Sequence, residues 1–183
     1  DPGTTGAPAP APRLSRAAFC GWFLRASFPD DFIDPATALR NFTDASGGDG
    51  AVVSFTGIMR AMAGDGTPIL SLTLETYRDV TLASMQAIAR DAHERFGISR
   101  SAVIHRKGKI APGEAIVFVA TASAHRRAAF EAADYLMDRL KTQAVFWKKE
   151  ETAQGNRWIE PTEGDGQDLA RWDIENGKKY AGN

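Results

Sequence analysis

The sequence predicts a single main domain of the α+β class, in which pairs of strands alternate with long helices. A chain of 183 residues that is 43% hydrophobic and 25% charged can bury one sizeable core. Short runs rich in strand-forming residues alternate with two longer segments whose apolar residues recur at helical spacing. The chain shows no internal repeat.

The N-terminal segments are the least regular. Residues 1–13 are rich in Pro, Ala and Gly and predict a flexible leader without a signal-peptide pattern. Residues 14–27 are apolar without a clean period, so strand and helix both remain open. In IDPATALRNF, Asp34 is suited to cap a helix and Pro35 to occupy its first position, which predicts a short helix.

Two strands are expected next. The turn-rich DASGGDG leads into the apolar run AVVSFTGI, residues 51–58. The following ILSLTLETY alternates apolar and polar residues, with Leu70, Leu72 and Leu74 set against Ser71, Thr73 and Glu75. One face of this second strand is therefore predicted to be buried.

Two long amphipathic helices follow, each with strands after it. From Asp79 onward apolar residues recur at helical spacing, at Met85, Ile88, Ala89, Ala92 and Phe96. Gly97 is placed to end this helix. SAVIHR and AIVFVATAS predict strands separated by the turn APGE. Ser123 is expected to cap the second helix, whose stripe is Ala129, Ala133, Leu136, Met137 and Leu140. AVFWKKE and RWIE predict two last strands, joined across TAQGN.

Composition limits the classes of function. A formal net charge of -1 and a pI near 6.4 argue against a general nucleic-acid or membrane binder. Cys20 is the only cysteine, which excludes an intramolecular disulfide and a cysteine-based zinc site and fits a cytoplasmic protein. No apolar run approaches the roughly 20 residues that span a bilayer. His93 and His105 have no metal-ligand spacing and are expected to be structural or surface residues.

Cationic residues nevertheless lie at the predicted start of one helix and at the predicted end of one strand. In SAHRR, the free N–H groups of a helix start together with His125 and Arg126 favour an anion, although a solvated first turn is the alternative. In FTGIMR, a strand runs into Arg60, whose guanidinium fork suits phosphate, although a plain surface arginine is the alternative.

A third group of cations lies in DRLKTQAVFWKKEE, residues 138–151. Lys141, Lys148 and Lys149 surround Phe146 and Trp147 there. The ordinary alternatives are a helix-end dipole partner and lysines that extend from a sheet edge into solvent.

Taken together, FTGIMR, HRKGKIAPGE, SAHR and LKTQAVFWKKE resemble, in order and context, the family of large, catalytic subunits of molybdopterin synthase. The match runs from about Gly48 to about Glu160 and is faint in the first 30 residues and in DLARWDIENGKKYAGN. The family commonly has proline where this chain has Val145. The resemblance implies a catalytic-subunit domain over residues 14–164 and a C-terminal tail over residues 165–183.

The resemblance also implies a fold and an activity. The expected fold is an α/β hammerhead-type domain with an additional small antiparallel β subdomain. In this family a small ubiquitin-like carrier brings sulfur as a thiocarboxylate on its C-terminal Gly-Gly. The large subunit transfers sulfur to cyclic pyranopterin monophosphate and forms the dithiolene of molybdopterin, without a metal or cofactor. The large subunits form a homodimer within a heterotetramer.

The site residues are carried over position by position. The substrate-binding residues fall on Ile58, Met59, Arg60, His125, Arg126, Lys141, Lys148, Lys149 and Glu150. Lys141 is expected to act beside the thiocarboxylate, and Lys148 to share that role or to move protons with a pKa lowered by burial and neighbouring cations. Glu150 is expected to orient Lys148, to temper the local charge or to form a surface ion pair. The expected pocket wall is Phe55, Met137, Phe146 and Trp147.

Two functions of other classes remain as alternatives. Strand pairs alternating with helices also suit a ferredoxin-like RNA-binding module, but AIVFVATAS lacks the aromatic pattern needed for base stacking. A non-catalytic docking partner of a ubiquitin-like carrier would need a groove for the tail, but not both Lys141 and Lys148.

Overall fold

The structure is a computed structural model that describes residues 23–27, 32–45, 47–144, 146–160 and 163–174. The expected leader, Cys20 and Val145 lie outside the described residues. Among the described helices, none is long and apolar enough to cross a membrane.

The larger sheet forms the centre of the fold. It contains β1 (Phe23–Ser27), β2 (Ala51–Ile58), β4 (Arg100–His105) and β6 (Ala115–Ser123), in the order β1-β4-β6-β2. The β1 strand pairs in parallel with β4, and the other pairs are antiparallel. The apolar segment left open as strand or helix therefore supplies a strand over its last residues.

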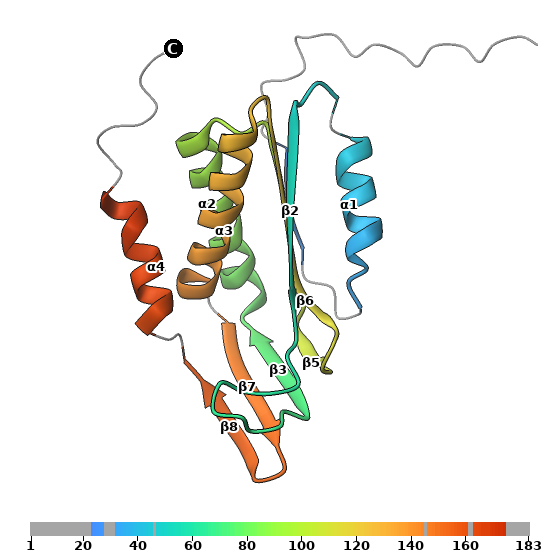
Figure 1. The fold of residues 1–183 in the computed structure, drawn as a ribbon, viewed down its shortest axis with the longest axis vertical. Helices are drawn as coiled ribbons and strands as arrows, with labels where there is room; N and C mark the ends of the chain where they lie inside the picture. Colours follow the sequence, from blue (N-terminus) through green and yellow to red (C-terminus); the bar gives the residue numbers. More distant parts are fainter. Residues whose placement is uncertain (1–22, 28–31, 46, 145, 161–162, 175–183) are drawn as a thin grey trace, which may run out of the picture.

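Helices cover both faces of this sheet. Figure 1 shows α1 (Pro35–Asp44) on one side and α2 (Arg78–Phe96) with α3 (Arg126–Gln143) on the other. The alternation along β6 accounts for this, because Val117 and Val119 belong to the core beneath α2 and α3, whereas Phe118 and Ala120 belong to the core beneath α1.

Two predicted helix signals are confirmed. The Asp34 carboxylate accepts a hydrogen bond from the Ala36 backbone N–H at 3.0 Å, with Pro35 in the first turn. Gly97 ends α2 in the left-handed region, at a φ of 62°.

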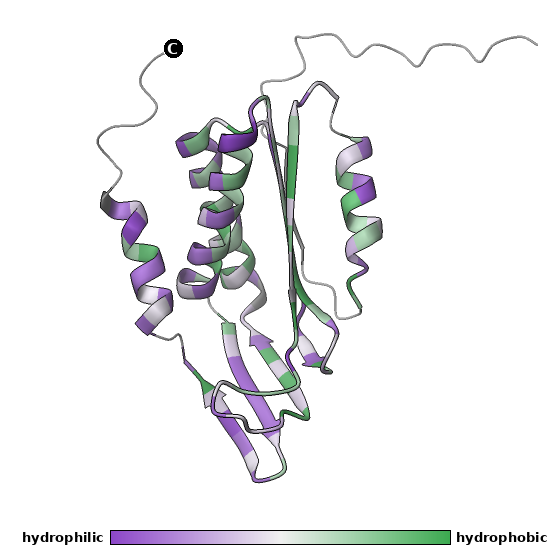
Figure 2. Ribbon diagram, in the orientation of Figure 1, coloured by the Kyte–Doolittle hydropathy of each residue, from purple (hydrophilic) through white to green (hydrophobic). Residues whose placement is uncertain are grey.

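A second, smaller antiparallel sheet extends from one end of the molecule. It contains β3 (Ser71–Thr76), β5 (Gly108–Ile110), β7 (Phe146–Thr152) and β8 (Gly155–Ile159), in the order β5-β3-β7-β8. Figure 2 shows hydrophobic residues along much of β2 and hydrophilic residues along much of β7. The α+β class with an added small antiparallel sheet is confirmed, and β5 is an element that the sequence patterns did not indicate.

Two local predictions were wrong. Leu72 and Leu74 are buried as expected, but Leu70 is 55% exposed and Ser71 is buried. Leu70 precedes β3, and the Ser71 hydroxyl is accommodated because it donates to Glu151 at 2.7 Å. Ser123 does not cap α3, because it still pairs with Ala51 in the sheet, and the cap position falls on His125.

A fourth helix, α4 (Glu163–Ile174), packs against α3 (Figure 1). Its Trp172 is 6% exposed and lies edge-on to Phe96 and Tyr135, with ring centroids 5.7 and 5.3 Å away. The tail expected from residue 165 onward thus contributes a residue to the main core, and residues 175–183 lie outside the described part.

Candidate functional site

A cavity of about 190 Å³ lies between the small sheet, the larger sheet and the last turns of α3. Both predicted catalytic lysines, Lys141 and Lys148, line it, as do the expected wall residues Phe55, Met137 and Phe146. The other lining residues are Gly57, Leu72, Leu74, His105, Ile116, Val117 and Leu140. The fold therefore joins residues that lie far apart in the sequence into one largely apolar chamber that contains two cations.

One side of the cavity is a row of residues across the larger sheet. Gly57 pairs with Val117, which pairs with His105 on its other side. A Cβ atom at Gly57 would lie 2.8 Å from Val117 Cγ1, closer than packed carbon atoms allow. The glycine in FTGIMR therefore keeps this part of the cavity open.

The alternation of β7 divides its residues between two faces. Lys148 pairs with Leu74 and Phe146 with Thr76, whereas Trp147 and Lys149 occupy the alternate positions. Lys149 Nζ lies 5.7 Å from the ring centroid of Trp158. Lys149 lines neither this cavity nor the neighbouring one described next, so the structure does not bring it together with Lys141 and Lys148.

A neighbouring cavity of about 290 Å³ opens between the end of α3 and strands β7 and β8. It shares Lys141, Phe146 and Lys148 with the first cavity, and Trp147 and Trp158 contribute to its wall. The two lysines therefore stand where the two cavities adjoin. The fourth expected wall residue, Trp147, faces this second cavity.

The environment of Lys148 differs from that of Lys141. Burial lowers the pKa of Lys148, the nearby Lys141 cation lowers it further, and Asp165 acts in the opposite direction. The predicted lowering of the Lys148 pKa is thus confirmed in direction and cause. Lys141 is half exposed and its Nζ lies 2.6 Å from the Asp165 carboxylate. A partly buried lysine with a lowered pKa is suited to proton transfer nearer neutral pH.

Glu150 does not orient Lys148 through a contact in this structure. Its carboxylate accepts a hydrogen bond from Arg157 Nε on β8 at 2.8 Å. Arg157 in turn contacts Asp65, in the connection between β2 and β3, at 3.0 Å. Of the three roles considered for Glu150, the ion pair is the one that the contacts support.

Among the lining residues that the sequence patterns did not assign to the site, His105 is the one with a titratable side chain. It is 7% exposed, its ring stacks on Phe146 with centroids 3.9 Å apart, and its Nδ1 lies 2.8 Å from the Arg106 carbonyl oxygen. Burial lowers the pKa of His105 to about 4, so the imidazole is neutral at pH 7. A lone histidine in a strand carries no spacing signal, and only the pairing of β4 with β6 places it in the cavity.

The pKa of His105 predicts a loss of stability in mild acid. An unfolded histidine titrates near 6.5, so between pH 6.5 and 4 the unfolded chain binds a proton that the folded chain does not. Stability attributable to His105 is therefore complete above pH 7 and about 2 kcal/mol lower at pH 5. Urea unfolding of the wild type should show a lower free energy of unfolding at pH 5 than at pH 7. In His105→Phe this fall should be smaller by about 2 kcal/mol. Equal declines in the two proteins would contradict the assignment.

The motif Ile58, Met59 and Arg60 follows the end of β2. Met59 is buried and held on both sides, since its N–H donates to the Glu114 carbonyl and its own carbonyl accepts from Gly113, each at 2.8 Å. Ile58 and Arg60 are exposed. The three residues line neither of the two cavities, so their predicted contact with substrate stays a prediction.

His125 and Arg126 lie at the opposite end of α3 from Lys141. Both are exposed, and Lys141 lies 15 positions after Arg126 (141 − 126) along α3, which is about 22 Å at 1.5 Å per residue. Within a single chain the structure therefore does not bring His125 and Arg126 together with Lys141, and their contact with substrate stays a prediction. The SAHRR motif predicts a basic helix start, but it does not indicate how far this start lies from the other motifs in the fold.

No group of three or more His, Cys, Asp or Glu side chains that could hold a metal ion occurs among the residues that the structure describes.

Comparison with known proteins assigns the chain to a family. The profile of the MoaE protein family matches residues 29–143. A molybdopterin synthase catalytic subunit from Caulobacter vibrioides is 49% identical over 146 residues, which are 80% of this chain and 95% of the relative.

Solved structures agree with this assignment. Molybdopterin cofactor biosynthesis protein E from Burkholderia multivorans, at 35% identity, has a TM-score of 0.70 and covers 84% of this chain and 99% of its own. Molybdopterin synthase from Staphylococcus aureus, at 27% identity, has a TM-score of 0.64 and covers 75% of this chain and 96% of its own. With this identity and a family match over more than half of its length, the chain belongs to the MoaE protein family.

Proposed function

We propose that this chain is the catalytic subunit of a molybdopterin synthase, a sulfurtransferase that acts on cyclic pyranopterin monophosphate. The sulfur donor is the thiocarboxylate at the Gly-Gly end of a small ubiquitin-like carrier. The observation that carries the proposal is the cavity in which Lys141 and Lys148 meet the apolar wall of Phe55, Met137 and Phe146. We place the reaction in the cytoplasm, which fits the single cysteine of the sequence.

The two lysines have separable roles in this chemistry. When the thiocarboxylate sulfur attacks a side-chain carbon of the pterin, a carbon–oxygen bond at that carbon gives its electron pair to oxygen. When water later attacks the resulting thioester, the acyl–sulfur bond breaks, the carrier leaves as a carboxylate and the sulfur stays on the pterin, so negative charge develops on oxygen in both steps. Lys141 Nζ, at the mouth of the cavity, is placed to stabilise that charge. Lys148, whose pKa is lowered by burial, is the better candidate for moving protons. The apolar wall limits water and strengthens both effects.

A homodimer would complete the set of cations. His125 and Arg126 are too far from Lys141 to act on the same substrate within one chain, so we propose that a second subunit supplies them. Strand β2 is at an edge of the described sheet. Phe55 on this strand and Phe130 on α3 are 44% and 62% exposed and line a shallow cavity together with Met137. This apolar edge adjoins the catalytic cavity and is suited to contact a second copy.

Mixed dimers test both the activity and the sharing of the site. The assay is dithiolene formation from purified thiocarboxylated carrier and cyclic pyranopterin monophosphate. Lys141→Ala and Arg126→Ala homodimers should each be impaired, the second partly rescued by excess substrate. After the two variants are unfolded and refolded together, activity should rise to about a quarter of wild type, because half of the dimers then carry one intact shared pocket. No rise on mixing would show that the residues act in the same chain or not at all.

The RNA-binding alternative finds no support in the sheet. An RNA-binding module of that kind stacks bases on aromatic residues of an open sheet face. The strand in question, β6, is covered by α1 on one face and by α2 and α3 on the other, and its residues from Val117 to Ser123 are buried.

A further inference from the structure

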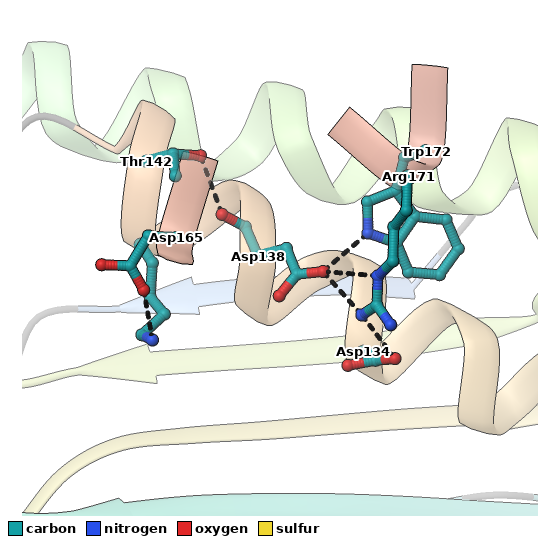
Figure 3. A network of polar contacts seen from close by, with 7 residues as sticks. Asp134, Asp138, Thr142, Asp165, Arg171 and Trp172 are labelled. Carbon is teal, nitrogen blue, oxygen red and sulfur yellow. Dashed lines mark hydrogen bonds and ion pairs between the residues drawn. The ribbon is translucent and has the colours of Figure 1, made fainter. Parts of the chain in front are cut away.

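Asp165, on the first turn of α4, is paired with the lysine that we assign to catalysis. Its carboxylate oxygen lies 2.6 Å from Lys141 Nζ, and its side chain is only 13% exposed (Figure 3). Asp165 lies beyond the matched family region, which ends at residue 143. A carboxylate of this chain therefore holds the ammonium group that, in the proposed reaction, must meet a thiocarboxylate of the same charge and similar shape.

The opposite end of α4 is firmly attached to α3. Trp172 Nε1 donates to the Asp138 carboxylate at 2.7 Å, and Arg171 contacts both Asp138 and Asp134 at 2.7 Å (Figure 3). Because residue 165 lies beside residue 141 and residue 172 beside residue 138, the two helices run antiparallel. The attachment of α4 does not depend on Asp165 alone.

The first turn of α4 is its weaker part. Gly164 and Gly166 flank Asp165, and glycine is among the least favourable residues within a helix. A Cβ atom at Gly166 would meet nothing within 4 Å, so no close approach of the backbone accounts for this glycine. The turn that carries Asp165 can therefore open at lower cost than the turn that carries Trp172.

We propose that Asp165 occupies, at Lys141, the place of the carrier's terminal thiocarboxylate, so that the incoming tail must displace the first turn of α4. This inference rests on the proposed function, since it assigns the tail to Lys141. The carboxylate keeps Lys141 positioned and its charge balanced until the carrier arrives. Asp165 also opposes part of the lowering of the Lys148 pKa, so its departure changes the environment of both lysines together.

The contact predicts which tails are accepted. After Asp165 is displaced, a carrier tail that ends in a carboxylate or thiocarboxylate gives Lys141 a new anionic partner. A tail that ends in an amide leaves Lys141 without one. Displacement is therefore favourable only for the chemically correct end of the carrier.

The test measures binding of the carrier, in its plain carboxylate form, to wild type, Asp165→Asn and Asp168→Asn. Asparagine keeps the size of the side chain and removes its charge. Asp168, exposed on the same helix, is the matched control for lost negative charge. We expect Asp165→Asn to bind the carrier about two- to fivefold more tightly, the range for a half-exposed ion pair, and Asp168→Asn to match wild type. Unchanged or weaker binding by Asp165→Asn would overturn the proposal.

A second measurement does not need the carrier. In the subunit alone, an amine-acylating reagent followed by peptide mass spectrometry should modify Lys141 faster in Asp165→Asn than in wild type, with Lys149 as the internal reference. An unchanged Lys141 rate would show that the ion pair is absent in solution and would also overturn the proposal. Wild type that neither binds the carrier nor forms product would instead refute the proposed function, so the two failures are distinguishable.

Discussion

Lys141→Ala should lower dithiolene formation by more than about a hundredfold, in the range measured when one group that stabilises charge in a transition state is removed. Carrier binding should weaken by less than about tenfold, or roughly 1.4 kcal/mol, because most of the docking area lies outside one side chain. Single-turnover assays with thiocarboxylated carrier and cyclic pyranopterin monophosphate separate the two quantities.

Two variants make this result specific. Lys141→Arg should not restore full activity, since arginine keeps the charge but spreads it over a bulkier, planar group that cannot replace the compact ammonium at the same point. Lys109→Ala is the matched control, because it removes a lysine–carboxylate pair of similar length, 2.7 Å to Glu151, from residues that line neither cavity. Near-normal turnover by Lys141→Ala would show that Lys141 has no catalytic role and is only a charged residue near the end of α3.

Local signals predicted α1, α2, α3 and most of the strands, but not α4, whose residues were expected to form most of a C-terminal tail. Asp34 and Gly97 mark ends because capping depends on a few neighbouring atoms, and helical periodicity in α2 reflects one buried face. Ser123 failed as a cap because pairing with Ala51 across the sheet keeps it extended. Ser71 is buried through a partner 80 residues away, which no local period reports.

The candidate site was predictable only in part. The family motifs pointed to Lys141, Lys148 and Phe146, and the structure brings these into one cavity. His105 joins them through strand pairing, and Asp165 through the docking of a helix beyond the matched region. Both contacts depend on tertiary packing, so residue types and their spacing in the sequence do not predict them.

Trp172→Ala should lower the free energy of unfolding by about 3–5 kcal/mol, the usual loss for a buried tryptophan. The substitution removes a ring packed edge-on against Phe96 and Tyr135 and the N–H group that donates to Asp138. Asp138 keeps its contact with Arg171, so the loss is mainly one of packing. Urea unfolding monitored by circular dichroism measures the change, provided that the m-value is unchanged.

Trp172→Phe keeps most of the aromatic packing and removes the hydrogen bond. Its ring is smaller and cannot donate to Asp138, so it should cost about 1–3 kcal/mol, from the lost hydrogen bond to a charged acceptor and from the smaller packed volume. If α4 is held as the contacts indicate, the alanine variant must lose clearly more stability than the phenylalanine variant. Trp172→Ala should also free Lys141 from its ion pair with Asp165, because Asp165 reaches that lysine only while α4 lies along α3. A loss below about 1 kcal/mol for Trp172→Ala would mean that α4 is not docked in solution, and the pairing of Asp165 with Lys141 would have to be abandoned with it.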